Sequence, residues 1–218
     1  MSASPLPEGY RELRPWEPGR RAPDADLIEA SSAGEVLAAS ERGFAAGDVY
    51  FTAPRKSGED LRRVMGKCRI VADSPEELHW IDQAVKRRPE AGNLEPVGIR
   101  LALDGWEGRG IKLRALPALS WELRGLDAIS IRGCFVQGDI HGLHGKALGR
   151  YFRDCFEAAK RASAVLPCGA AFLCVTGGGK AARRNAEEHP ETLPEFRRAA
   201  AIIAAQNSSA FYARLLIS

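Results

Sequence analysis

Short apolar runs alternate with amphipathic stretches along most of the chain. An uninterrupted apolar run bounded by turn residues is typical of a buried strand in a parallel sheet. Such runs predict strands at residues 26–30, 48–53, 68–72, 97–103, 128–136 and 170–175. Apolar residues at helical spacing predict helices at residues 33–43, 58–65, 75–88, 146–164 and 193–205. The alternation indicates an α/β domain with a parallel sheet, which a doubly wound sheet and a (β/α) barrel both satisfy.

The start of the chain differs from the rest. Residues 1–24 are rich in Pro, Gly and Arg and predict an N-terminal arm or cap, which leaves residues 25–218 as one folded domain. A full barrel of eight units takes about 250 residues. A chain of 218 residues with an irregular start is therefore short for one.

Composition says more about the partners and the cellular compartment of the protein than about its function. The net charge of +3 comes from 31 basic and 28 acidic residues, an excess too small to indicate a nucleic-acid or membrane partner. Five cysteines without a CxxC pair favour a reducing compartment. The first residues lack a signal-peptide core, and no apolar stretch approaches the roughly 18 residues of a membrane span. We expect a soluble, cytoplasmic protein.

The glycine run Thr176-Gly177-Gly178-Gly179 directly follows the apolar run at residues 170–175. Taken alone, a glycine triplet is most often a flexible turn. Glycines at the carboxyl end of a barrel strand also leave backbone N–H groups free, and phosphate groups commonly dock there. The position therefore makes Gly177–Gly179 a candidate phosphate loop.

Other polar segments carry weaker signals. Ser31 and Ser32 can cap the helix that follows or contact a ligand. The loop at residues 52–57, with two cations, is read equally well as a surface loop or an anion contact. His141 and His144 form an HxxH pair, but two histidines without a third ligand make a poor zinc site, so we expect no metal.

Several of these segments together resemble the fold-type III pyridoxal-phosphate (PLP) decarboxylases. That family includes the ornithine, diaminopimelate and arginine decarboxylases, which share their barrel with alanine racemase. The segments keep the family's order and spacing over about residues 25 to 180. They resemble D-V-A-S-x-G-E at residues 29–35, I-x-F-T-G-P-x-K-[ST] at 50–57, I-x-V-D-S-x-E-E-L at 69–78, V-G-L-R at 97–100 and L-D-x-G-G-G at 176–179.

The resemblance implies a (β/α) TIM-type barrel, complete or incomplete, without the family's C-terminal β domain. It also implies a ligand: PLP bound non-covalently, or another phosphate-bearing small molecule, with an amino acid as a further candidate partner. The residues assigned to the cofactor are Gly177, Gly178, Gly179, Ser31, Ser32, Arg100 and Gln137. The sequence leaves open whether the arm, the apolar segment at residues 210–217 or a partner subunit completes the barrel. An incomplete barrel would expose strand edges, so we expect a homodimer.

Departures from the family concern its catalytic groups. The Schiff-base lysine lies in Y-A-x-K-A-N, about 20 residues before D-V-A-S, whereas here that region is residues 5–11 and the first lysine is Lys56. The family histidine of G-L-H-F-H-I-G-S is replaced, with Gln137 as the candidate substitute. No counterpart of E-P-G-R, whose glutamate pairs with the pyridine nitrogen, precedes Ser218. Without the lysine, PLP has no amine for an internal aldimine.

Three functions follow from the resemblance and its departures. We favour a PLP-binding barrel that is catalytically impaired or inactive. The second hypothesis is an active amino-acid decarboxylase or racemase with a relocated lysine, for which Lys56, Lys112 and Lys180 are candidates. The third is a non-enzymatic scaffold or interaction protein that keeps only the fold. The sequence does not assign any catalytic residue.

Overall fold

The computed structural model describes residues 11–19, 27–88, 94–106, 108–138, 143, 145–166, 172–176 and 214–217. These residues form nine strands, all of whose pairings are parallel. The strands are β1 (Arg11–Pro15), β2 (Leu27–Ala30), β3 (Val49–Phe51), β4 (Arg69–Ala72), β5 (Glu95–Ala102), β6 (Ile111–Lys112), β7 (Ile129–Gln137), β8 (Phe172–Thr176) and β9 (Arg214–Ile217).

The pairings run through eight of these strands in a ring. Starting at β1, the order is β2, β3, β4, β5, β7, β8 and β9, and β9 pairs again with β1. The two-residue strand β6 is not part of this ring and pairs with β5. This is the TIM-type barrel expected from the sequence resemblance, and the doubly wound alternative is excluded for this chain.

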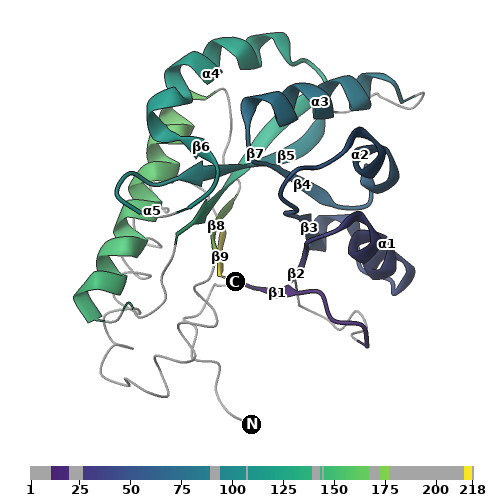
Figure 1. The fold of residues 1–218 in the computed structure, drawn as a ribbon, viewed down its shortest axis with the longest axis horizontal. Helices are drawn as coiled ribbons and strands as arrows, with labels where there is room; N and C mark the ends of the chain where they lie inside the picture. The colour runs from purple at the N-terminus through teal and green to yellow at the C-terminus, as the bar shows by residue number, and fades with distance from the viewer. Residues whose placement is uncertain are drawn as a thin grey trace.

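Helices lie outside the strands (Figure 1). They are α1 (Ala33–Glu41), α2 (Gly58–Val64), α3 (Pro75–Lys86), α4 (Leu116–Glu122) and α5 (Gly145–Val165), with 3₁₀ turns at Ala46–Asp48, Leu113–Ala115 and Leu123–Gly125. Within the described ranges, α1, α2, α3 and α5 follow β2, β3, β4 and β7. α4 follows β5, with the short strand β6 between them. None of these helices is both long and apolar enough to span a bilayer.

Serine side chains define the starts of three helices. The hydroxyls of Ser32, Ser57 and Ser74 each accept a hydrogen bond from the backbone N–H three residues on, which satisfies one donor that the helix leaves unpaired. Asp60 completes a capping box with Ser57 by accepting from the Ser57 N–H. These caps place the helix starts at the carboxyl ends of β2, β3 and β4.

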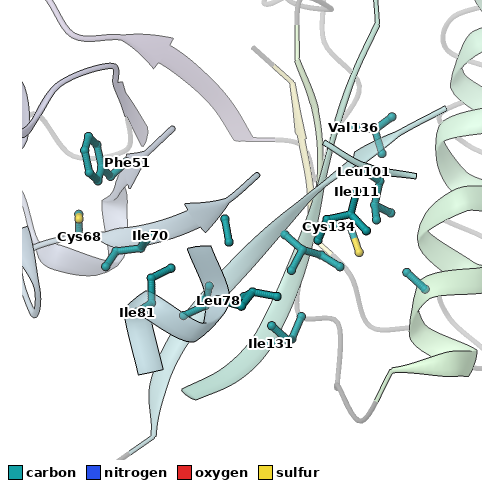
Figure 2. Packing of buried hydrophobic residues seen from close by; sticks show 14 of the residues in the cluster. Phe51, Cys68, Ile70, Leu78, Ile81, Leu101, Ile111, Ile131, Cys134 and Val136 are labelled. Carbon is teal, nitrogen blue, oxygen red and sulfur yellow. The ribbon is translucent and has the colours of Figure 1, made fainter. Parts of the chain in front are cut away.

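The core has two parts. The larger part packs the outward faces of the strands against the helices, and Figure 2 shows its members around Ile70, Leu78 and Cys134. The smaller part fills the barrel interior with one side chain from each of five strands. Its members are Leu13, Leu27, Tyr50, Val71 and Phe135, all nearly inaccessible to solvent.

The structure completes the barrel with elements from both ends of the chain. β1 lies within the segment assigned to an arm or cap, and β9 lies within residues 210–217, which are apolar enough for a strand; the two pair with each other and complete the ring. β6 and α4 are short elements in residues 104–127, where the hydrophobic pattern predicted no element. The predicted helix at 193–205 falls outside the described residues. All six predicted strands are present, with ends shifted by up to two residues.

Candidate ligand site at the carboxyl ends of the barrel strands

A cavity of about 270 Å³ opens where the barrel strands end. Side chains from the ends of β1, β2, β3, β5 and β7 contribute to its walls, together with the loop before β6. We call it the mouth cavity; its lining residues are Pro15, Trp16, Glu29, Ser31, Glu35, Thr52, Pro54, Arg100, Arg109 and Gln137.

Strand periodicity explains why this end of the barrel is polar. Successive side chains of a strand point to opposite faces, so residues two apart share one face. Two positions beyond the interior residues Leu27, Tyr50 and Phe135 come Glu29, Thr52 and Gln137. The same step leads from Leu13 to Pro15 and from Val71 to Asp73. An apolar layer therefore closes the barrel interior, and a polar layer lies directly above it.

Arg100 is the best-fixed residue of the polar layer. Its side chain is 2% exposed, and its guanidinium donates three hydrogen bonds: Nε to Asp73 Oδ1 at 2.9 Å, Nη1 to Gln137 Oε1 at 2.6 Å and Nη2 to the Thr52 carbonyl at 2.9 Å. Because the Gln137 oxygen accepts from Arg100, the amide nitrogen is turned toward the remaining space and can donate to a ligand. Arg100 thus links β3, β4 and β7 and orients Gln137.

Glu29 brings a carboxyl group into the same layer. The Thr52 hydroxyl donates to its Oε1 at 3.0 Å. Burial raises the pKa of Glu29 above the ordinary carboxyl value, while the Thr52 hydrogen bond and the positive charges of Arg100 and Arg109 act in the opposite direction. The raised pKa means that Glu29 holds its proton more readily than an exposed glutamate does. It can then donate a hydrogen bond to an anionic ligand as well as accept one.

In the loop before β6, Arg109 lies between two glycines, Gly108 and Gly110, and lines the mouth cavity. A side chain at Gly108 would place its Cβ 2.1 Å from the carbonyl oxygen of Gln137. At Gly110 the backbone has φ +128°, and a Cβ would lie 2.6 Å from the carbonyl oxygen of Arg100. Only glycine fits at both positions, because an added Cβ would collide with a backbone carbonyl oxygen of β7 or β5. The loop is thereby pressed onto the ends of β5 and β7, and Arg109 joins the lining.

Among the described residues, no lysine lines the mouth cavity. The resemblance places the family's lysine in the region of residues 5–11, of which the structure describes only Arg11, the first residue of β1. Lys56 lies in the β3–α2 loop, where its Nζ donates to Glu77 Oε2 at 3.0 Å and to the Ala53 carbonyl at 2.8 Å. Lys112 is exposed on β6. The described residues therefore do not fit PLP held as an aldimine, although they do fit a non-covalent anionic ligand.

The buried Lys56–Glu77 pair has a structural role, because groups of the protein itself hold both side chains. The Lys56 side chain is inaccessible, and Glu77 also accepts from the backbone N–H groups of Lys56 and Asp73. Burial lowers the pKa of Lys56, against the opposing effect of the Glu77 charge. The pair joins the β3–α2 loop to α3. Of the two loop cations, for which the sequence left surface exposure and anion contact equally open, Lys56 is instead paired within the protein.

Three of the residues assigned from the sequence meet in this cavity: Ser31, Arg100 and Gln137. Ser32 does not line it and caps α1 instead. The remaining candidates lie outside the described residues: Gly177, Gly178, Gly179, Lys180, and both histidines of the HxxH pair, His141 and His144. Within the described ranges, no three His, Cys, Asp or Glu side chains are grouped as metal ligands.

The sequence assignment missed Trp16, Glu29, Thr52 and Arg109. Glu29 and Thr52 were inside matched segments, and their even spacing from Leu27 and Tyr50 was the available signal. Trp16 follows a strand that the pattern did not predict. The sequence signal for Arg109 was its two flanking glycines. Their role can be recognised only when the backbone groups that they approach are known.

Comparison with known proteins gives matches at the level of fold. No family model and no curated protein matches the sequence. Among solved structures, the arginine decarboxylase of Paramecium bursaria Chlorella virus has a TM-score of 0.65 at 16% identity, over 88% of this chain and 51% of that one. Alanine racemase of Clostridium difficile has a TM-score of 0.63 at 13% identity, over 98% and 51%.

A shorter match is PipY of Synechococcus elongatus, solved with PLP bound, with a TM-score of 0.58 at 16% identity over 78% of this chain and 83% of that one. The chain spans about half the length of the decarboxylase and the racemase. The strand order, the polar layer and these matches agree with the ordered sequence motifs. The chain therefore has the barrel fold of the fold-type III PLP decarboxylases and alanine racemase.

Proposed function

We propose that the mouth cavity binds a phosphate-bearing small molecule without a covalent bond, with PLP as the first candidate. The observation that carries the proposal is a polar cavity at the strand ends, without a lysine among its described lining residues and built around an Arg100 side chain that three partners already fix. Ligand sites of α/β barrels lie at this end of the strands. The PLP-bound state of PipY supports PLP as the candidate.

Chain connectivity supports the glycine run as the phosphate contact. Thr176, the last residue of β8, pairs with Gln137 of β7, which lines the cavity. Gly177 follows Thr176 directly in the sequence. Backbone N–H groups of Gly177–Gly179 would hold the phosphate, while Gln137 and Arg109 would contact the remainder of the ligand.

PLP bound through a lysine supplies an electron sink for amino-acid chemistry. In this chain the described residues bind and orient, and they offer no amine at the cavity. Gln137 donates through its amide, Glu29 holds or releases a proton at its carboxyl group, and Trp16 covers one side of the space. We therefore propose a binding protein whose amino-acid chemistry is impaired, rather than a decarboxylase or racemase.

Calorimetric titration with PLP and with pyridoxine 5′-phosphate tests this proposal. The second compound lacks the aldehyde and cannot form an aldimine, so we expect the two dissociation constants to agree within about threefold. Pyridoxine, without phosphate, should bind at least tenfold more weakly. Much tighter binding of PLP would support a relocated lysine, and binding of none of the three compounds would leave the scaffold hypothesis.

A homodimer and a cytoplasmic location remain parts of the proposal. The edges that an incomplete barrel would expose are paired in the ring, by β1 with β9 and by β4 with β5, so the argument from open edges no longer applies. Sedimentation equilibrium of the full chain tests the dimer. A single species at the monomer mass across the micromolar range would refute it.

A further inference from the structure

A second cavity lies outside the barrel, between α2 and α3. It has a volume of about 700 Å³, within the range of sites for small organic ligands. Figure 1 shows the two helices side by side on the outer layer. We call it the outer groove; its lining residues are Arg55, Lys56, Ser57, Gly58, Arg62, Ser74, Glu77, Trp80, Gln83, Ala84 and Arg87.

The charges of the outer groove are unbalanced. Lys56 and Glu77 form the buried ion pair at its floor and compensate each other. The remaining charged lining residues are Arg55, Arg62 and Arg87, all exposed, and none of them forms an ion pair within the part of the chain that the structure describes. Guanidinium groups bind carboxylates and phosphates through parallel N–H donors. Three unpaired guanidinium groups around one cavity favour an anion.

Trp80 gives the groove a flat apolar wall. Its side chain is 52% exposed, although the neighbouring α3 residues Leu78 and Ile81 are fully buried in the core. The core therefore does not account for an indole at this position. An exposed indole beside cations can stack on a planar ring, because aromatic faces attract other rings and the polar edge remains solvated.

Local backbone geometry turns the β3–α2 loop toward both cavities. Thr52 and Pro54 line the mouth cavity, whereas Arg55 and Lys56 line the outer groove. Arg55 has φ +59°, in the left-handed region that is unfavourable for a residue with a side chain. Two different sets of residues thus line the two cavities, and each set can be altered without touching the other.

We propose that the outer groove is a second binding site, for a small molecule that combines a planar ring with a phosphate group. The ring stacks on Trp80, and the phosphate is bound by Arg62 with Arg55 or Arg87. The volume exceeds what a bare inorganic anion would fill. The floor is a polar ion pair instead of the continuous apolar surface that receives an amphipathic helix, which favours a small molecule over a docked helix.

Titration with adenosine 5′-monophosphate and phenyl phosphate tests this proposal, with adenosine and inorganic phosphate as part-ligands. We expect at least one of the two ring phosphates to bind at least tenfold more tightly than either part-ligand. Arg62→Gln should weaken that binding five- to tenfold. Arg63→Gln is the matched control, since Arg63 is the exposed neighbour on α2 that does not line the groove; its effect should stay below twofold.

A second pair of variants tests the stacking. Trp80→Leu should weaken ring-phosphate binding at least fivefold and remove the accompanying change in tryptophan fluorescence. Trp121→Leu, at a more exposed indole on α4, should leave both unchanged. Binding of neither ring phosphate would overturn the proposal, as would equal effects of the paired variants. Arg109→Gln, in the mouth cavity, should not alter this binding, so failure here is distinguishable from failure of the proposed function.

Discussion

Arg100 and Glu29 show how single side chains make a polar layer inside a barrel. Arg100 is buried with all three nitrogens of its guanidinium in use, which offsets the cost of removing its charge from water. The Glu29 side chain accepts a single hydrogen bond from the described residues, from the Thr52 hydroxyl, and burial raises its pKa. The first residue is therefore a fixed support, and the second responds to pH.

Glu29→Gln should stabilise the protein increasingly as pH rises. The folded-state pKa of Glu29 lies above its unfolded value, so the folded state binds more protons in the interval between them. Glu29 thus favours the native state least at pH values above its folded pKa, where ionisation costs the most. The difference in unfolding free energy, variant minus native, should grow from about pH 4.5 upward and then level off.

Urea unfolding at several pH values measures this difference. Thr52→Val is a useful control, because it removes the hydroxyl donor and should raise the Glu29 pKa further. A difference that shrinks with rising pH would contradict the assigned direction.

At the scale of elements, the β3–α2 loop and α3 are joined by the buried Lys56–Glu77 pair. Local sequence signals foresaw these elements because their causes are local: Ser57 and Ser74 cap helices, and the acids that follow favour the helix start. The Lys56–Glu77 contact spans 21 residues and has no local signal. The sequence therefore left both loop cations open between surface and anion contact. Burial in the ion pair excludes both interpretations for Lys56, while Arg55 is exposed.

Lys56→Met should destabilise the protein by about 3 to 5 kcal/mol, since it leaves the Glu77 carboxylate buried without its charge partner. The double variant Lys56→Met/Glu77→Gln should regain part of that loss, because it leaves no unpaired charge buried. The recovery is incomplete, because the backbone N–H groups of residues 56 and 73 donate to different carboxylate oxygens and the amide keeps only one acceptor oxygen. Urea unfolding of the native chain, both single variants and the double variant gives the coupling energy. Additive single effects would show that the pair is not coupled.

The loop before β6 is the second element with a specific test. Gly108→Ala places a Cβ against the Gln137 carbonyl, so the loop must move and take Arg109 with it. We expect mouth-cavity binding to weaken about tenfold, at a stability cost of about 1 to 3 kcal/mol. Gly125→Ala, where no atom lies within 4 Å of the added Cβ, is the control and should change neither quantity appreciably. Unchanged affinity in Gly108→Ala would remove Arg109 from the ligand site.

At the scale of the whole molecule, alternating strands and helices were enough to predict an α/β domain, and the ordered motifs were needed to identify a barrel. What the sequence could not supply was closure. β1 and β9 are short and come from opposite ends of the chain, and they count as barrel strands only because they pair with each other and with β2 and β8. The same closure sets Pro15 and Trp16 at the mouth cavity, where both contribute to its lining.

The central claim is that this barrel binds a phosphate-bearing ligand without a lysine linkage. Borohydride trapping with intact-mass measurement tests it most directly, on the full chain saturated with PLP as judged by calorimetry. We expect a saturable complex and an unmodified protein mass after reduction. A single pyridoxyl adduct that excess pyridoxine 5′-phosphate prevents, mapped to Lys56, Lys112 or Lys180, would contradict it.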